Sequence, residues 1–243
     1  MQIQIGGEFF NEIINEKYYY IDKTSFIEEL LTNSQSKITL ITRPRRFGKT
    51  LMMSTLYNFF DINKKNMNMF DGLYISHNKD LCKRWMNKYP TICISLKEFE
   101  GLNFQEAISK FQIYISGYLI KNFLFLTNSQ YIADIDKKNL EQTINVEVNK
   151  IQTSYFLSLL MRCLKMHYKK NVIVLIDEYD TPLIKAYENG YYTEMVDFVR
   201  TMLGCALKTN DDLLFSVLTG CLRISKESIF TGINNFNCFD LLN

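Results

Sequence analysis

Residues 41–50 read ITRPRRFGKT, and residues 172–180 read VIVLIDEYD. In each stretch, a run of apolar, β-favouring residues passes directly into charged and polar ones. Two more runs of the same kind lie at 91–96 (TICISL) and 213–218 (LLFSVL), and the first run begins at residue 37. Continuous apolar runs are typical of strands buried on both faces, so these four predict a mainly parallel sheet.

Helical patterns lie before and between the strand runs, at 24–31, 50–60, 104–126, 154–168 and 192–207. Alternating strands and helices predict an α/β fold in three layers, α/β/α. No repeat and no Pro/Ser-rich linker divides the chain, so we expect one domain over residues 1–243. The polar stretch at 134–139 is predicted to be a surface connection.

The composition excludes several classes of protein. With 28 Lys+Arg against 26 Asp+Glu the chain is near neutral, so a nucleic-acid-coating protein is not the first hypothesis. With 47% hydrophobic residues, disorder is excluded as the main state. The six cysteines have no metal-binding spacing and are expected to be reduced. Because no leader-like or membrane-spanning segment is apparent, we expect a cytoplasmic protein without membrane partners.

The stretch 43–51 joins the first strand to a helix. At such a join, backbone N–H groups and the helix dipole attract an anion, and Gly48 lets the backbone approach it closely. Lys49 can reach the β- and γ-phosphates of a nucleotide, and the Thr50 hydroxyl can ligate Mg²⁺. The usual pattern is GxxxxGK[ST], and Arg43 replaces the first glycine. A surface turn that opens a helix is the alternative.

The predicted nucleotide-binding residues are Arg43, Pro44, Arg45, Arg46, Phe47, Gly48, Lys49, Thr50 and Leu51.

Two adjacent carboxylates, Asp177 and Glu178, end the strand at 172–176. In a P-loop ATPase, the first acid orients Mg²⁺ and the second polarises the attacking water. Solvated acids at a strand end are the alternative. The two motifs in this order favour nucleotide binding, with Thr50 and Asp177 as the metal residues and Glu178 as the base.

Thr219 ends the strand run that starts at 213, and Arg223 follows it. If this strand lies between the two motif strands, Thr219 can contact the γ-phosphate or the lytic water, and Arg223 can add positive charge there. We therefore count both as candidate catalytic residues. A turn hydroxyl for Thr219 and a surface ion pair for Arg223 are the alternatives.

These residues carry a family resemblance. The stretches YYYIDKTSFIEELL (18–31), ITRPRRFGKTLMMSTLYNFF (41–60), VLIDEYDTPL (174–183) and VLTGCLRISKESIFTGINN (217–235) resemble the AAA-ATPase-like family of P-loop proteins. The resemblance implies a P-loop NTPase fold with an AAA+-like core, with ATP and Mg²⁺ as ligands. It also implies that RPRRFGKT is the form of the phosphate loop that this family uses, so that Arg43 in place of glycine is typical of the family. The segment 22–24 matches a signature that we place near the nucleotide base, with helix capping by Asp22 as the alternative.

Proteins that resemble this chain continue past residues 232–235 into a helical lid and a nuclease-like domain of the restriction-endonuclease type. We expect both to be missing from these 243 residues, and the Asp136 to Lys138 DxK pattern is given no catalytic role. The leading hypothesis is an ATPase, and its expected partners are ATP and other subunits or the missing domain; nucleic acid is not indicated. A nucleotide-gated interaction or regulatory module with little turnover, and a small-molecule kinase, are the alternatives.

Overall fold

The computed structural model describes residues 7–32, 36–65, 67–221 and 236–239. These residues form a five-stranded parallel sheet in the order β2-β3-β4-β1-β5. Its strands are β1 (Ile38–Thr42), β2 (Thr91–Ser95), β3 (Val172–Asp177), β4 (Leu213–Gly220) and β5 (Phe236–Phe239). The prediction of a parallel sheet is confirmed.

Strand β4 lies between β1 and β3, which is the position that the hypothesis about Thr219 required. Ile41 of β1 pairs with Thr219 of β4, and Ile176 of β3 pairs with Leu218. Because all three strands run in the same direction, their carboxyl ends meet at one edge of the sheet. The residues that follow them are therefore neighbours in space.

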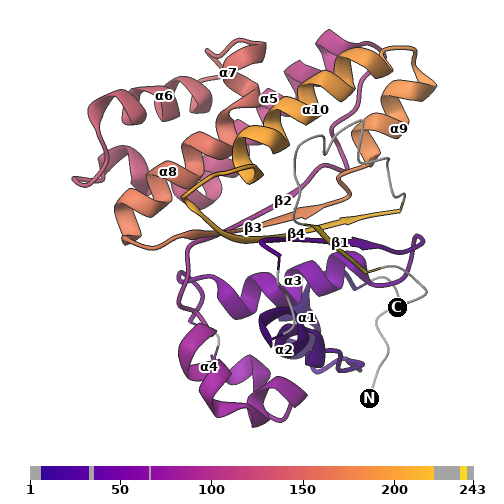
Figure 1. Cartoon of the computed structure of the whole chain (residues 1–243), viewed down its shortest axis with the longest axis vertical. Helices are drawn as coiled ribbons and strands as arrows, with labels where there is room; N and C mark the ends of the chain where they lie inside the picture. The colour runs from indigo at the N-terminus through magenta and orange to yellow at the C-terminus, as the bar shows by residue number, and fades with distance from the viewer. Residues whose placement is uncertain (1–6, 33–35, 66, 222–235, 240–243) are drawn as a thin grey trace.

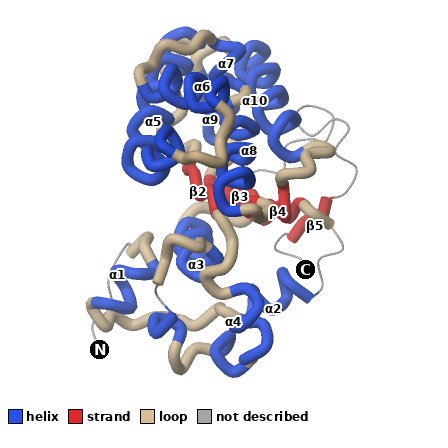
Figure 2. The backbone as a smooth tube through the Cα atoms, turned by 90° about the vertical axis from the view of Figure 1, so that its left-hand side faces the viewer, coloured by secondary structure: helices blue, strands red, loops and turns tan. Residues whose placement is uncertain are grey.

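Helices cover both faces of the sheet, as Figures 1 and 2 show. On one face lie α1 (Phe10–Asn15), α2 (Ser25–Thr32), α3 (Lys49–Phe60) and α4 (Lys79–Trp85), with the short 3₁₀ helices η1 (Met67–Phe70) and η2 (Tyr74–His77). On the other lie α5 (Phe104–Phe123), η3 (Leu124–Asn128), α6 (Asp134–Ile144), α7 (Lys150–Ser154), α8 (Phe156–Tyr168), α9 (Thr181–Glu188) and α10 (Tyr192–Leu207). The three-layer α/β/α class is thereby confirmed.

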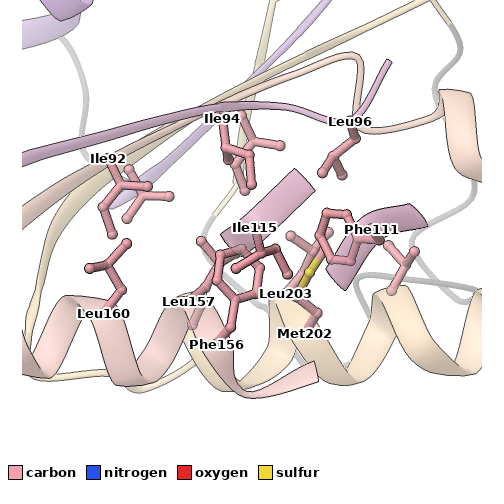
Figure 3. Packing of buried hydrophobic residues seen from close by; sticks show 14 of the residues in the cluster. Ile92, Ile94, Leu96, Phe111, Ile115, Phe156, Leu157, Leu160, Met202 and Leu203 are labelled. Carbon is pink, nitrogen blue, oxygen red and sulfur yellow. The ribbon is translucent and has the colours of Figure 1, made fainter. Parts of the chain in front are cut away.

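Each face of the sheet buries its own apolar cluster. On β3, Val174 belongs to the cluster beneath α5, α8 and α10, whereas Leu175 belongs to the cluster over α3. This alternation explains why the strand reads as a continuous apolar run, since both faces are covered. Figure 3 shows the first cluster, with Ile92 and Ile94 of β2 and Leu96 just after it facing residues of three helices. These are Phe111 and Ile115 of α5, Phe156, Leu157 and Leu160 of α8, and Met202 and Leu203 of α10.

The prediction of a surface connection at 134–139 is wrong, because these residues begin α6. Leu140 on this helix is buried, and the Asp136 carboxylate accepts two hydrogen bonds from the Arg162 guanidinium of α8, at 3.0 and 2.6 Å. An anchoring ion pair and a narrow apolar face hold the helix in place. The apolar periodicity that indicates a helix in sequence is correspondingly weak here.

The remaining differences concern element ends and elements that were not predicted, among them the short helices α1, α4 and α9. The predicted helix at 104–126 ends at residue 123 and continues as η3, and the predicted helix at 154–168 begins at residue 156, after the separate helix α7. Strand β5 has no counterpart among the predicted elements.

Candidate functional site

The loop after β1 has an unusual backbone. Arg46 and Gly48 have positive φ angles of 68° and 73°, whereas the residues between and beside them are not among those with positive φ. Alternation of left- and right-handed residues turns successive N–H groups toward a common point and forms an anion-binding nest. Gly48 is also the residue just before α3, so the start of the helix lies at the same point.

Lys49 lies inside this loop, with only 7% of its surface exposed. Its ammonium Nζ donates hydrogen bonds to the backbone oxygens of Arg43 (2.9 Å) and Pro44 (3.0 Å) and to Cys221 Sγ (3.4 Å). The loop backbone and the end of β4 together hold this positive charge within the nest.

Asp177, at the end of β3, connects the end of β4 with the first turn of α3. Thr50 Oγ1 donates to Asp177 Oδ2 at 2.7 Å, and the Thr219 hydroxyl donates to Asp177 Oδ1. The carboxylate and Thr219 are buried. Residues predicted separately from three motifs are thus in direct contact.

The donor set at Thr50 and Asp177 suits Mg²⁺. Both groups offer hard oxygen atoms, and Mg²⁺ in nucleotide sites keeps several waters and needs few protein ligands. Among residues 7–32, 36–65, 67–221 and 236–239, no group of three or more His, Cys, Asp or Glu side chains is arranged to hold a metal. The residues present fit a magnesium ion that is shared with a phosphate ligand.

Glu178 occupies a left-handed backbone position, with φ of 52°. Its N–H donates to Asp177 Oδ1 at 3.1 Å, and its carboxylate Oε2 accepts a hydrogen bond from Thr181 Oγ1 at 3.1 Å. A non-glycine residue in this conformation costs about 1–2 kcal/mol. The carboxylate is therefore adjacent to Asp177 but is held by the first turn of α9.

Three residues that were not predicted complete the site. Gly220 lies so close to the turn after β3 that a Cβ there would stand 2.6 Å from Tyr179 Cε1. The Asp180 carboxylate Oδ2 accepts the Cys221 N–H at 2.8 Å. In the sequence, Gly220 and Cys221 directly follow Thr219, and Asp180 is the last acid of the DEYD run. The sequence does not show that they meet, because their contact depends on the pairing of β3 with β4.

The three loop arginines differ in exposure. Arg45 and Arg46 are exposed and Arg43 is half-buried, and within the described part of the chain none of their guanidinium groups forms an ion pair. Phe47 is 56% exposed, whereas the Leu51 side chain packs against the apolar cluster over α3. The mouth of the loop is thus positively charged.

Two further predicted features have different outcomes. Arg223 lies outside the described residues. Asp22 accepts hydrogen bonds from the N–H and hydroxyl of Thr24 and from the Tyr74 N–H, so it joins the segment before α2 to η2. Burial raises the pKa of its carboxyl, but these hydrogen bonds outweigh burial and leave the pKa below its ordinary value.

Two global features of the described residues bear on the sequence predictions. None of their helices has both the length and the apolarity needed to cross a membrane. The cysteines whose side chains are described, Cys82, Cys93, Cys163, Cys205 and Cys221, are free thiols.

Comparison with known proteins gives one family and one curated relative. The chain is 27% identical over 238 residues to an uncharacterized protein in the vnfD 5' region of Azotobacter chroococcum mcd 1. The alignment covers 97% of this chain and 40% of that protein, so the chain spans less than half of its relative's length. No solved structure matches the chain. The sequence model of the AAA-ATPase-like family, described as "Predicted AAA-ATPase", matches residues 4–230, and the chain therefore belongs to this family.

Proposed function

We propose that the chain binds ATP with Mg²⁺ at residues 43–51 and hydrolyses it. The observation that carries this proposal is the contact of Thr50 with Asp177 beside the alternating loop and the enclosed Lys49 ammonium. An anion nest, a buried cation and a pair of hard oxygen ligands at one point form the combination that a nucleoside triphosphate with Mg²⁺ requires. Residues 1–243 act in this proposal as one nucleotide-binding domain.

The phosphate groups are bound by the loop amides and by Lys49. The ammonium already lies among backbone acceptors of the loop, and a short side-chain rotation directs it to β- and γ-phosphate oxygens. Thr50 and Asp177 hold Mg²⁺, which when bound supplies positive charge to the phosphate oxygens. The loop arginines Arg43, Arg45 and Arg46 attract the triphosphate to the mouth of the loop.

Glu178 is the proposed general base. It accepts a proton from the water that attacks the γ-phosphorus, while the bond between that phosphorus and the bridging oxygen of ADP breaks. The Thr219 hydroxyl, fixed by Asp177, orients the water or the γ-phosphate. Arg223 is proposed to add positive charge to the same oxygens.

The hydrogen bond from Thr181 to Glu178 favours a second candidate, a nucleotide-gated module with little turnover. While Glu178 Oε2 accepts from Thr181 Oγ1, this oxygen is engaged in the turn and is less available to a water molecule. In that case, ATP binding itself is the signal to other subunits or to a further domain.

Isothermal titration with ATP in Mg²⁺ and in EDTA, followed by a phosphate-release assay, separates the candidates. Mg²⁺-dependent binding with release supports the ATPase, and binding without release supports the module. Absence of binding refutes both. Thr181→Ala adds a sharper test, because removing the hydroxyl frees Glu178 and should raise turnover if that hydrogen bond restrains the base.

A further inference from the structure

Asp180 is the last acid of the DEYD run, and its carboxylate is 1% exposed. It precedes α9 and reaches across to the end of β4, where Oδ2 accepts the Cys221 N–H at 2.8 Å. Hydrogen bonds between a carboxylate and a backbone N–H are about twice as strong as neutral ones. A buried bond of this kind fixes the peptide that donates it.

The carboxylate also packs closely against Gly220, since a Cβ at that position would be 2.8 Å from Asp180 Oδ1. Next to it, the Tyr179 N–H donates to the Thr219 carbonyl at 3.0 Å. The register of β3 with β4 ends at Ile176 and Leu218, so these contacts extend the junction beyond the last strand pair. The turn after β3 therefore sets where β4 ends.

The peptide that Asp180 holds is part of the phosphate site. Cys221 Sγ lies 3.4 Å from Lys49 Nζ, and two residues earlier the Thr219 hydroxyl contacts Asp177. We propose that Asp180 is a positioning residue, which keeps the end of β4 in place so that Thr219 and Cys221 face the bound phosphates. This inference rests on the proposed ATP site and adds a residue to it.

The contacts predict which step depends on Asp180. The Lys49 ammonium keeps its hydrogen bonds to the Arg43 and Pro44 carbonyls and loses at most the weaker contact with Cys221, so ATP affinity should fall less than kcat does. Thr219 depends on the end of β4, and misplacement of an aligning group by about 1 Å costs up to ~100-fold. Asp180→Ala should therefore lower kcat about 10- to 100-fold.

Asp180→Asn is the conservative partner of this variant, because its amide oxygen still accepts the Cys221 N–H. It should retain most of the turnover that Asp180→Ala loses. Asp136→Ala is the matched control, since it also removes a buried carboxylate, one that pairs with Arg162 on α8. It should lower the melting temperature without changing kcat per folded molecule.

A second readout does not require ATP. The rate at which iodoacetamide labels Cys221, followed by peptide mass spectrometry with Cys82 as the internal reference, reports how firmly the end of β4 is held. Labelling should accelerate in Asp180→Ala and stay near wild type in Asp180→Asn and Asp136→Ala.

The outcomes separate this inference from the proposed function. The inference is overturned if Asp180→Ala keeps the wild-type kcat and the wild-type rate of Cys221 labelling. It is also overturned if Asp180→Ala and Asp180→Asn lose kcat to the same extent. A wild-type protein that binds no ATP overturns the proposed function, while Cys221 labelling still decides whether Asp180 holds the end of β4.

Discussion

Replacing Lys49 by alanine is the most direct perturbation of the proposed site. The ammonium is the side-chain cation enclosed by the loop, with donor distances of 2.9 and 3.0 Å to the Arg43 and Pro44 carbonyls. Charged hydrogen bonds contribute about 1.5–3 kcal/mol each, so loss of its phosphate contact should weaken ATP binding about 10- to 150-fold. The fold should persist, because water can reach the exposed loop and replace the donor to its carbonyls.

Thermal unfolding converts this loss into a measurable shift. At an ATP concentration of about 100 times Kd, a bound ligand stabilises the folded state by ~2.7 kcal/mol, which for a chain of this length raises the melting temperature by about 5–10 °C. If Lys49→Ala raises Kd about 30-fold, the same ATP concentration stabilises by only ~0.9 kcal/mol, or about 2–3 °C.

Lys138→Ala is the matched control for this experiment, since Lys138 is an exposed lysine on α6. It should show the full wild-type shift with ATP. A folded Lys49→Ala protein with an ATP-induced shift and a titrated Kd equal to wild type would refute the assignment of the loop as the phosphate site.

Four further predictions test other parts of the molecule. Glu178→Gln should retain ATP binding while phosphate release falls by about 10²–10⁴, the contribution of a general base, and unchanged release would remove Glu178 from the mechanism. Gly220→Ala should destabilise the fold by about 1–3 kcal/mol in a urea titration, because its Cβ meets the buried Tyr179 ring 2.6 Å away; an unchanged midpoint would contradict the close packing. Arg46→Gly should stabilise the apo protein by about 1 kcal/mol, since Arg46 holds a φ of 68°. If the Arg46 guanidinium reaches the γ-phosphate, this variant should also lose more affinity for ATP than for ADP at low salt. Burial raises the pKa of the Asp61 carboxyl from 3.8 to about 6, so the folded state binds this proton more tightly than the unfolded state does. The free energy of unfolding should therefore fall as pH rises from about 4 to 6. Urea titrations at stepped pH should show this fall in the wild type and lack it in Asp61→Asn.

The sequence by itself determined the strands and which polar residues follow them. Apolar runs that are continuous rather than alternating can be stable only as strands covered on both faces, and this pattern predicted β1 to β4 within two residues at each end. The positions of Lys49 and Thr50 were equally predictable. A glycine, a lysine and a threonine at a strand-to-helix join are local features, and α3 begins at Lys49.

Only the tertiary structure decided which distant residues meet. Thr50 and Asp177 are 127 positions apart, and Asp180 and Cys221 are 41 apart, yet each pair forms a hydrogen bond. These contacts follow from the order of the strands in the sheet. Neighbouring strands pair through backbone N–H and C=O groups, so the residue types of a strand do not by themselves specify which strand lies beside it. Helix α6 shows the same limit, because a polar segment with few apolar residues gains its stability from a partner, Arg162 on α8, that lies 26 positions from Asp136.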